Sequence, residues 1–189
     1  MAVTNILIVG VGGQGTLLAS RVMGNLGLSL GHDVKLSEVH GMAQRGGSVV
    51  THVRFGKKVF APVIDIGQAD IILSFEKLEA LRWMHYLKKD GKMFVNLQEI
   101  SPMPVVIGAA QYPEKIEDKI AEKVDVQFVD ALTLANKAGN TKAVNIVLIG
   151  VLAKNMDIEK EKFIEAIKTT VPEKFLDINL KAFELGYNA

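Results

Sequence analysis

The sequence predicts an α/β fold, a Rossmann-like three-layer sandwich whose sheet is mostly parallel and contains one antiparallel hairpin. The first observation is an unbroken apolar run followed by a glycine-rich turn and a helix-like apolar period, which indicates a strand, a tight turn and a helix. The second is that short apolar runs go on alternating with amphipathic stretches. The third is a turn signal at Gly56–Lys58 between two strand-like runs, which is typical of a hairpin.

Short apolar or alternating segments have the composition of strands. Ile6–Val9 is apolar throughout, as expected for a strand buried on both faces. Val49–Phe55 alternates in character, and the return strand of the hairpin is expected at Val59–Ala61, before Pro62. Further strands are predicted at Asp33–Ser37, Asp70–Ser74, Lys92–Leu97 and Val126–Val129, with a short one at Val105–Ile107.

The first helix is predicted from Gln14 to Leu30, with Gly31 as its C-terminal stop. Gly24 and Gly27 lie inside it at a cost of about 1 kcal/mol each relative to alanine, which indicates close packing on the sheet. Other helices are predicted at Phe75–Leu87 (stopped by Lys88–Gly91), Pro113–Glu122, Ala131–Ala138, Val144–Ala153, Glu159–Thr169 and Phe175–Leu185. The segment Val144–Ala153 is apolar on all sides, so it is buried either in this core or under another subunit, and a homodimer of the isolated chain is one expectation.

Length and composition indicate one folded domain over residues 1–189, since no linker, repeat or low-complexity tract divides the chain. The start has no basic leader, and no apolar stretch reaches the length of a membrane span, so we expect a cytoplasmic protein without membrane contact. With 22 basic and 21 acidic residues, and no basic stripe, nucleic acid is not an expected partner. The chain has no cysteine, which excludes a disulfide, a thiolate nucleophile and a cysteine-ligated iron–sulfur cluster.

The glycine turn is the first candidate binding site, and its residues are Gly10, Gly12, Gly13, Gln14 and Gly15. Backbone N–H groups at the start of the following helix are suited to a phosphate or a carboxylate. A dinucleotide site would also need an acidic residue near the end of the second strand, where Glu38 is the candidate. A tight turn without any nucleotide explains these residues at least as well.

A second candidate is the polar segment that follows, with His40, Gln44, Arg45, Gly46 and Gly47. A guanidinium beside exposed backbone N–H groups can bind an anion bidentately, although an arginine that fixes its own turn has the same pattern. His40 suits either acid–base work or a structural role, and the structural role is favoured.

Three further groups of residues are weaker candidates for a functional site. Glu76 and Glu79 are spaced for paired carboxylates, but glutamate in a first helical turn more often complements the helix dipole. Asn145 is interpreted as a capping or buried hydrogen-bonding residue that could instead face a ligand. None of the histidines has the spacing of a metal site, so no metal is expected.

Three blocks together resemble a known family. They are Gly10–Gly15, then Glu38–Ser48 with its His-Gly-Met-Ala-Gln-Arg-Gly-Gly core, then Gly67–Asp70 running to Phe75-Glu76 and Glu79–Arg82. The chain is similar, over essentially its whole length, to the gamma domain of 2-oxoacid:ferredoxin oxidoreductases. Within that family it looks most like the indolepyruvate-type beta subunits. The His-Gly-Met-Ala-Gln-Arg-Gly-Gly block is highly specific, whereas the glycine turn alone is not.

The resemblance implies a role in the oxidative decarboxylation of an aryl 2-oxoacid to its acyl-CoA, with electrons passed to ferredoxin. It further implies that thiamine diphosphate, magnesium and the [4Fe–4S] clusters belong to a large alpha subunit, with coenzyme A as co-substrate. The chain itself would bind none of these cofactors alone and would complete the substrate or CoA side of the active site. The absence of cysteines agrees with this division.

Other readings stay open from the residues. They are a gamma subunit that acts on another 2-oxoacid, a free-standing dinucleotide-binding protein, an adenylating enzyme of the ubiquitin-activating type, and an assembly scaffold with an empty glycine turn. Residues suited to hydride transfer, which a dinucleotide-dependent enzyme would need, are not evident. The arginine and lysine that would bind ATP in an adenylating enzyme are not evident either.

Overall fold

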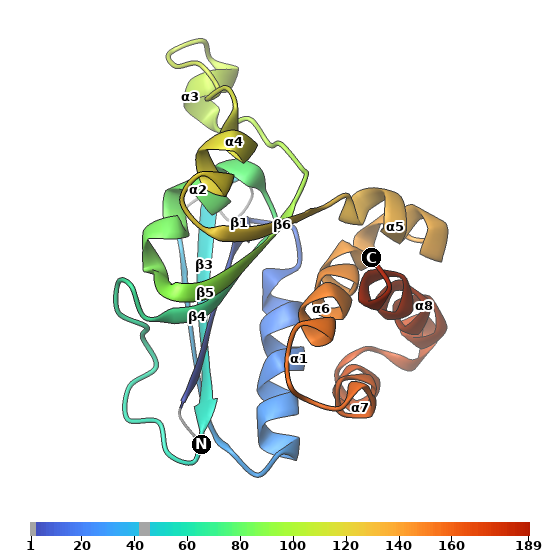
Figure 1. The fold of residues 1–189 in the computed structure, drawn as a ribbon. Coiled ribbons are helices and arrows are strands. Elements are labelled where there is room, and N and C mark those ends of the chain that lie inside the picture. The colour runs from blue at the N-terminus through green and yellow to red at the C-terminus, as the bar shows by residue number, and fades with distance from the viewer. Residues whose placement is uncertain (1–2, 42–45) are drawn as a thin grey trace.

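A computed structural model describes residues 3–41 and 46–189 and contains one six-stranded sheet (Figure 1). The strand order is β2-β3-β1-β4-β5-β6, with β1, β4, β5 and β6 parallel and β3 antiparallel to both of its neighbours. The predicted fold class is therefore confirmed. The strands are β1 (Thr4–Val11), β2 (Asp33–His40), β3 (Ser48–Gly56), β4 (Ala69–Ser74), β5 (Leu87–Asn96) and β6 (Asp125–Val129).

The antiparallel hairpin is formed by β2 and β3, and the predicted return strand Val59–Ala61 does not form. Both edges of β3 are already paired, one with β1 and the other with β2, so a further strand has no place beside it. Side chains satisfy the backbone of the segment instead. The Val59 N–H donates to Asp33 Oδ2 at 2.9 Å, and Arg54 Nη1 donates to the carbonyl oxygens of Ala61 and Val63.

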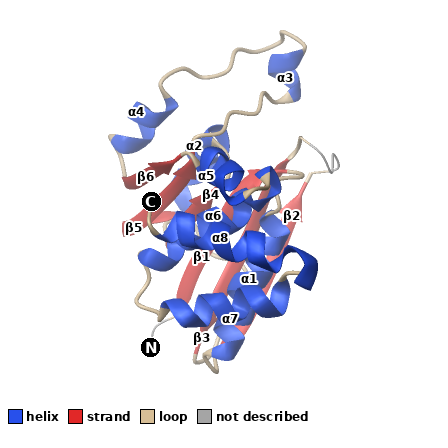
Figure 2. Ribbon diagram, turned by 90° about the vertical axis from the view of Figure 1, so that its right-hand side faces the viewer, coloured by secondary structure: helices blue, strands red, loops and turns tan. Residues whose placement is uncertain are grey.

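Helices cover both faces of the sheet (Figures 1 and 2). One face packs against α1 (Thr16–Ser29), α5 (Ala131–Ala138), α6 (Val144–Lys154), α7 (Lys160–Thr170) and α8 (Leu176–Tyr187). The other packs against α2 (Lys77–Trp83), the short turn η1 (Met84–Tyr86) and α4 (Ile116–Ala121). The remaining pieces are α3 (Met103–Val106), η2 (Thr141–Ala143) and η3 (Glu173–Phe175). Among the described residues, no helix is long and apolar enough to cross a lipid bilayer.

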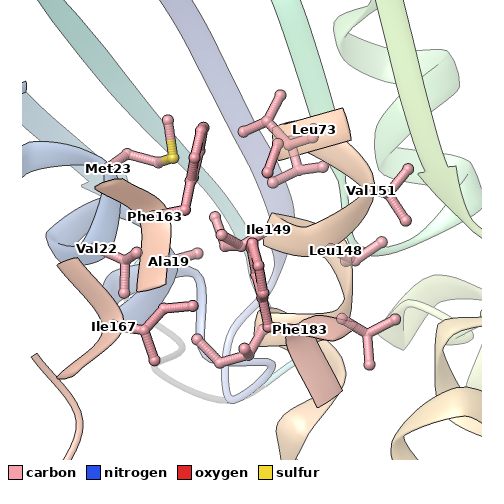
Figure 3. Packing of buried hydrophobic residues seen from close by; sticks show 14 of the residues in the cluster. Ala19, Val22, Met23, Leu73, Leu148, Ile149, Val151, Phe163, Ile167 and Phe183 are labelled. Carbon is pink, nitrogen blue, oxygen red and sulfur yellow. The ribbon is translucent and has the colours of Figure 1, made fainter. Parts of the chain in front are cut away.

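The helix α6 forms the centre of the larger core, and its residues from Val144 to Ala153 are all buried within this one chain. Figure 3 shows Ile149 of α6 beside Phe163 and Phe183, whose ring centroids lie 6.3 Å apart. The first of the two predicted explanations for this apolar helix therefore holds, and the helix gives no reason to invoke a second copy.

The structure differs from the predicted elements at three further places, and the predicted helix Phe75–Leu87 is shorter, with α2 ending at Trp83 and η1 following it. The segment Lys88–Gly91 lies inside β5 rather than stopping a helix, because the strand begins at Leu87 and a register irregularity absorbs the extra residues. Val105–Ile107 is not a strand, because Pro102 and Pro104 favour the start of α3. The charged helix begins at Ile116 instead of Pro113, after a residue in the left-handed conformation.

Candidate functional site

The glycine turn joins the end of β1 to the start of α1 at the edge of the sheet where the parallel strands end. This edge is where open α/β sheets place their ligands. Gly15 has a φ of 87° and caps α1, and Gly13 has a φ of 103°. Both lie in the left-handed region that glycine adopts without strain, so the turn depends on these two positions.

Gln14 fixes the shape of the turn and has little capacity left for a ligand. Its Oε1 accepts from the Val11 N–H at 2.7 Å, and its Nε2 donates to the Phe75 carbonyl and to Gln98 Oε1, both at 3.0 Å. A Cβ on Gly10 would come within 2.9 Å of Gln14 Oε1. Gly10 is thus required by the packing of this side chain.

Asn145, at the start of α6, packs against the turn rather than facing a ligand. Its Nδ2 donates to the Gly15 carbonyl at 3.4 Å, and its Oδ1 accepts from the Ile146 N–H at 2.9 Å. A Cβ on Gly15 would come within 2.6 Å of that Nδ2. This supports the interpretation of Asn145 as a buried hydrogen-bonding residue.

The second predicted candidate lies directly beside the first. The Gly12 N–H donates to the Gly47 carbonyl at 2.8 Å, and the Gly46 N–H donates back to the Gly12 carbonyl at 3.4 Å. The structure therefore brings the glycine turn and the Gly46–Gly47 pair together. Gln44 and Arg45 lie outside the described residues.

A hollow of about 290 Å³ lies over the turn and is the candidate binding site. It is lined by Gly12, Gly13, Gly15, Thr16, Leu17, Glu38, His40 and Val49. The first turn of α1 lies at this end of the helix and has no side-chain cap; its Leu18 N–H donates to the Gly15 carbonyl at 3.1 Å, and the earlier N–H groups of an α-helix have no partner within the helix. Together with the helix dipole they make the wall formed by α1 suited to an anion.

The opposite wall comes from β2 and carries Glu38 and His40. Glu38 Oε2 accepts from Thr51 Oγ1 at 3.1 Å, and the exposed His40 ring has its Nδ1 3.1 Å from the Gly41 carbonyl oxygen. Glu38 does line the hollow, as a ribose-binding acid would. However, β3 separates β1 from β2, whereas the dinucleotide fold places these two strands side by side.

The seam between α1 and β2 holds a second hollow of about 510 Å³, which shares no lining residue with the first. It is lined by Arg21, Gly24, Asn25, Leu28, Val34, Leu36, Thr169 and Thr170. Leu17, Arg21 and Leu28 follow one face of α1 at helical spacing, so both hollows share that face. Two separate hollows therefore lie along this face of α1.

Glu76 and Glu79 are both buried, and their carboxylates are taken up by contacts within the chain. Glu76 caps α2 by accepting from the Glu79 N–H at 2.8 Å, as the helix-dipole interpretation predicts. Glu79 accepts from Ser48 Oγ, from Arg82 Nε at 3.1 Å and from Trp83 Nε1 at 3.2 Å. Within the described ranges, no group of three or more His, Cys, Asp or Glu side chains is arranged to hold a metal ion.

Sequence reasoning missed the seam residues Leu17 and Arg21 and the turn's partner Gln98. Gln98 follows β5 by two residues, and nothing in its local sequence distinguishes it from any surface amide. For α1 the sequence held no such signal either, because Leu17 and Leu28 suit a buried helix face in sequence and only the structure shows them to be 47% and 60% exposed.

Comparison with known proteins gives a consistent result. A family model described as pyruvate ferredoxin/flavodoxin oxidoreductase matches residues 5–189. The indolepyruvate oxidoreductase subunit IorB of Thermococcus kodakarensis is 46% identical over 98% of this chain and 95% of its own length. The protein of the same name from Archaeoglobus fulgidus is 43% identical over 97% of this chain and 94% of its own length.

Solved structures share the fold. The pyruvate oxidoreductase subunit PORC from Thermotoga maritima is 21% identical, with a TM-score of 0.76 over 100% of this chain and 97% of that one. The 2-oxoglutarate:ferredoxin oxidoreductase from Magnetococcus marinus, whose structure holds 2-oxoglutarate, coenzyme A and succinyl-CoA, is 16% identical with a TM-score of 0.72. The match covers 100% of this chain but 31% of that longer chain.

Proposed function

Because the chain belongs to the pyruvate ferredoxin/flavodoxin oxidoreductase family, we propose that it is the small subunit of an indolepyruvate oxidoreductase. The observation that carries this proposal is identity of 43% to 46%, over nearly the full length of both chains, to subunits of that name. Relatives that act on other 2-oxoacids are less similar, for example 27% for a ketoisovalerate oxidoreductase subunit. An aryl 2-oxoacid is therefore the favoured substrate.

In this proposal the complex decarboxylates the 2-oxoacid oxidatively to its acyl-CoA and passes the electrons to ferredoxin. The residues of this chain do not suit the redox cofactors, because it contains no cysteine to ligate an iron–sulfur cluster. Thiamine diphosphate, magnesium and the [4Fe–4S] clusters are accordingly assigned to the large alpha subunit. The chain is then inactive alone.

The contribution of this chain is proposed to be the hollow over the glycine turn, which would receive an anionic group of coenzyme A or of the 2-oxoacid. The N-terminal turn of α1 supplies the donors, and an extended ligand such as coenzyme A would have to follow the same face of α1 toward the second hollow. The carboxylate of Glu38 stands across the hollow and would have to lie beside a hydroxyl or amide of the ligand rather than beside its anion.

A charge placed in the hollow tests this role. Leu17 is the second residue of α1 and is 47% exposed, so Leu17→Asp keeps the helix stable while it adds a negative charge beside the bound anion. The added repulsion is on the order of 1 kcal/mol or more, so the KM for coenzyme A or for the 2-oxoacid should rise by about fivefold or more. Steady-state kinetics on the assembled complex measures this.

The matched control is Leu17→Asn, because asparagine has the size of aspartate and no charge. Its KM should be close to that of a second uncharged variant, Leu17→Ala. Equal KM values for Leu17→Asp and Leu17→Asn, in complexes that assemble equally well, would show that no anion binds at this turn.

The function itself is tested by expressing the chain together with its candidate alpha subunit and purifying through a tag on one of them. A stable complex is expected. A chain that stays free of the alpha subunit, and that binds NADH tightly by itself, would contradict the proposal and favour a dinucleotide-binding protein.

A further inference from the structure

An exposed arm of the chain, residues 97–115, leaves the end of β5 and returns to the start of α4. It projects beyond the sheet in both views of the molecule (Figures 1 and 2). The side chains of Met103, Val106 and Ile107 near its tip are 67%, 66% and 69% exposed. Three neighbouring apolar side chains that stay about two-thirds exposed indicate an interaction site.

The base of the arm is fastened to the N-terminus of α2 by a buried carboxylate. Glu76 is 1% exposed, and its Oε1 accepts from the Ile100 N–H at 3.2 Å and from the Tyr112 hydroxyl at 2.6 Å. These contacts hold both the segment that leaves the sheet, at Ile100, and the segment that returns to it, at Tyr112. Burial, and then the hydrogen bond to Glu76, raise the pKa of Tyr112, so its hydroxyl remains a donor at neutral pH.

The neighbouring residue repeats the arrangement with the opposite charge. Lys77 Nζ pairs with Glu99 at 2.5 Å on one side of the arm and with Glu117 at 2.8 Å just beyond the other. Burial opposes the charge of Lys77, but the two hydrogen-bonded carboxylates outweigh it and raise its pKa. The Lys77 side chain is 10% exposed, whereas those of Glu99 and Glu117 are 56% and 39% exposed, so the two ion pairs join α2 to the base of the arm at the protein surface.

The tip is also ordered by its own backbone. The Ala109 and Ala110 N–H groups donate to the Pro104 carbonyl at 2.8 and 3.0 Å, and the Ile107 N–H donates to the Met103 carbonyl at 3.0 Å. A surface that keeps its shape before binding loses less entropy on binding. The arm is therefore a preorganised element.

The distribution of charge on the arm matches the anatomy of a protein interface. Residues 101–111 contain no charged side chain, in a chain of which 23% is charged. Glu99 precedes this uncharged tip, and Glu114 and Lys115 follow it. An apolar, uncharged centre with a charged rim is what interface cores present to a complementary, uncharged recess.

We propose that the arm is the docking element by which this chain binds its large alpha subunit, with residues 101–111 inserted into an apolar, uncharged recess of that subunit. This inference rests on the proposed function. The arm's base also contacts the glycine turn, since Gln98 Oε1 accepts from Gln14 Nε2 at 3.0 Å. Docking through the arm would thus bring the candidate binding hollow to the same side as the partner.

A second copy of this chain is a poorer occupant. Unless two copies exchange arms reciprocally, an arm that enters a hollow on an identical chain makes a heterologous contact, which gives a ring if the rotation closes and an open filament if it does not. In the longer oxidoreductase chain from Magnetococcus marinus, the same fold matches 31% of one polypeptide, which supports a larger, non-identical partner over a second copy.

The test compares two equivalent substitutions on the complete chain. Ile107→Asp changes the arm, and Ile66→Asp changes an isoleucine of nearly equal exposure, 65%, in the loop before β4. Val106→Asp serves as a second arm variant. The Kd of each variant for the purified, immobilised alpha subunit is measured by surface plasmon resonance. Circular dichroism and the Tm first confirm that each variant is folded.

We expect both arm variants to weaken binding at least tenfold while Ile66→Asp binds like the unaltered chain. Arm variants that bind as well as the unaltered chain would overturn the docking inference and leave the proposed function standing. Failure of the unaltered chain itself to bind would overturn both. A self-associating chain that Ile107→Asp makes monomeric, with alpha-subunit binding intact, would assign the arm to a second copy instead.

Discussion

At the scale of single residues, Gln14 illustrates how one amide can define a turn. Its side chain joins the end of β1 to Phe75 after β4 and to Gln98 after β5. The position between glycines made it a candidate ligand residue, because sequence alone does not tell which partners a side chain reaches. The structure uses its donor and acceptor within the chain, and the neighbouring glycines give it room.

His52 permits a prediction about pH at the same scale. It is 5% exposed, and its Nδ1 accepts from the Ile64 N–H at 3.1 Å, which fixes the loop before β4. Burial, and then the charge of Arg54, lower the pKa of His52 below its usual 6.5. As the pH falls, His52 therefore becomes protonated in the unfolded chain at a higher pH than in the folded chain. The contribution of the neutral His52 to the free energy of unfolding is fully present above pH 6.5, and it is lost as the pH falls toward the lowered pKa of the folded chain.

The free energy of unfolding of the unaltered chain should fall between pH 7 and 5.5, by at most about 1.4 kcal/mol per pH unit from this group. His52→Gln should flatten that dependence, whereas His85→Gln, at an exposed histidine, should not. Urea unfolding at several pH values measures this. Parallel pH profiles for the unaltered chain and His52→Gln would contradict the assignment.

At the scale of elements, the contact between α6 and α8 depends on two glycines. A Cβ on Gly150 would come within 2.7 Å of the Tyr187 nitrogen, and a Cβ on Gly186 would overlap the Val147 carbonyl. The two backbones are thus packed too closely for any side chain. Gly186→Ala should destabilise the fold by about 3 kcal/mol, even though alanine favours helices.

Gly41→Ala is the control for this substitution, because nothing lies within 4 Å of a Cβ there and φ is not in the left-handed region. Its effect should stay within about 0.5 kcal/mol. Denaturant midpoints compare the two. A Gly186→Ala chain as stable as Gly41→Ala would mean that α8 does not pack this closely on α6.

The same scale shows what periodicity can and cannot predict. Ile6–Val9 and Val144–Ala153 are long or apolar enough that pattern alone identifies them, and both predictions are confirmed. Val59–Ala61 has the pattern of a strand, but both edges of β3 are taken and side chains bind its backbone. That outcome depends on the pairing of distant strands, which local sequence does not contain.

At the scale of the whole molecule, the sequence predicted the α/β sandwich with helices on both faces of the sheet. It also predicted the glycine turn and the Gly46–Gly47 pair as candidate binding sites. The structure adds that the two segments are in direct contact, which the sequence did not predict. The arm was missed, because its run of uncharged residues reads as an irregular joint unless one knows that Glu76 and Lys77 fix its base. Long-range polar contacts of this kind leave no local period.

The molecule as a whole is best understood as one part of a larger enzyme, with an apolar arm and a candidate anion site at one edge of its sheet. The most direct test is CoA-dependent reduction of a viologen dye with indolepyruvate, measured for this chain, for its alpha subunit and for the two together. Activity in the combined sample alone is the predicted result. Full activity of the alpha subunit without this chain would contradict the account.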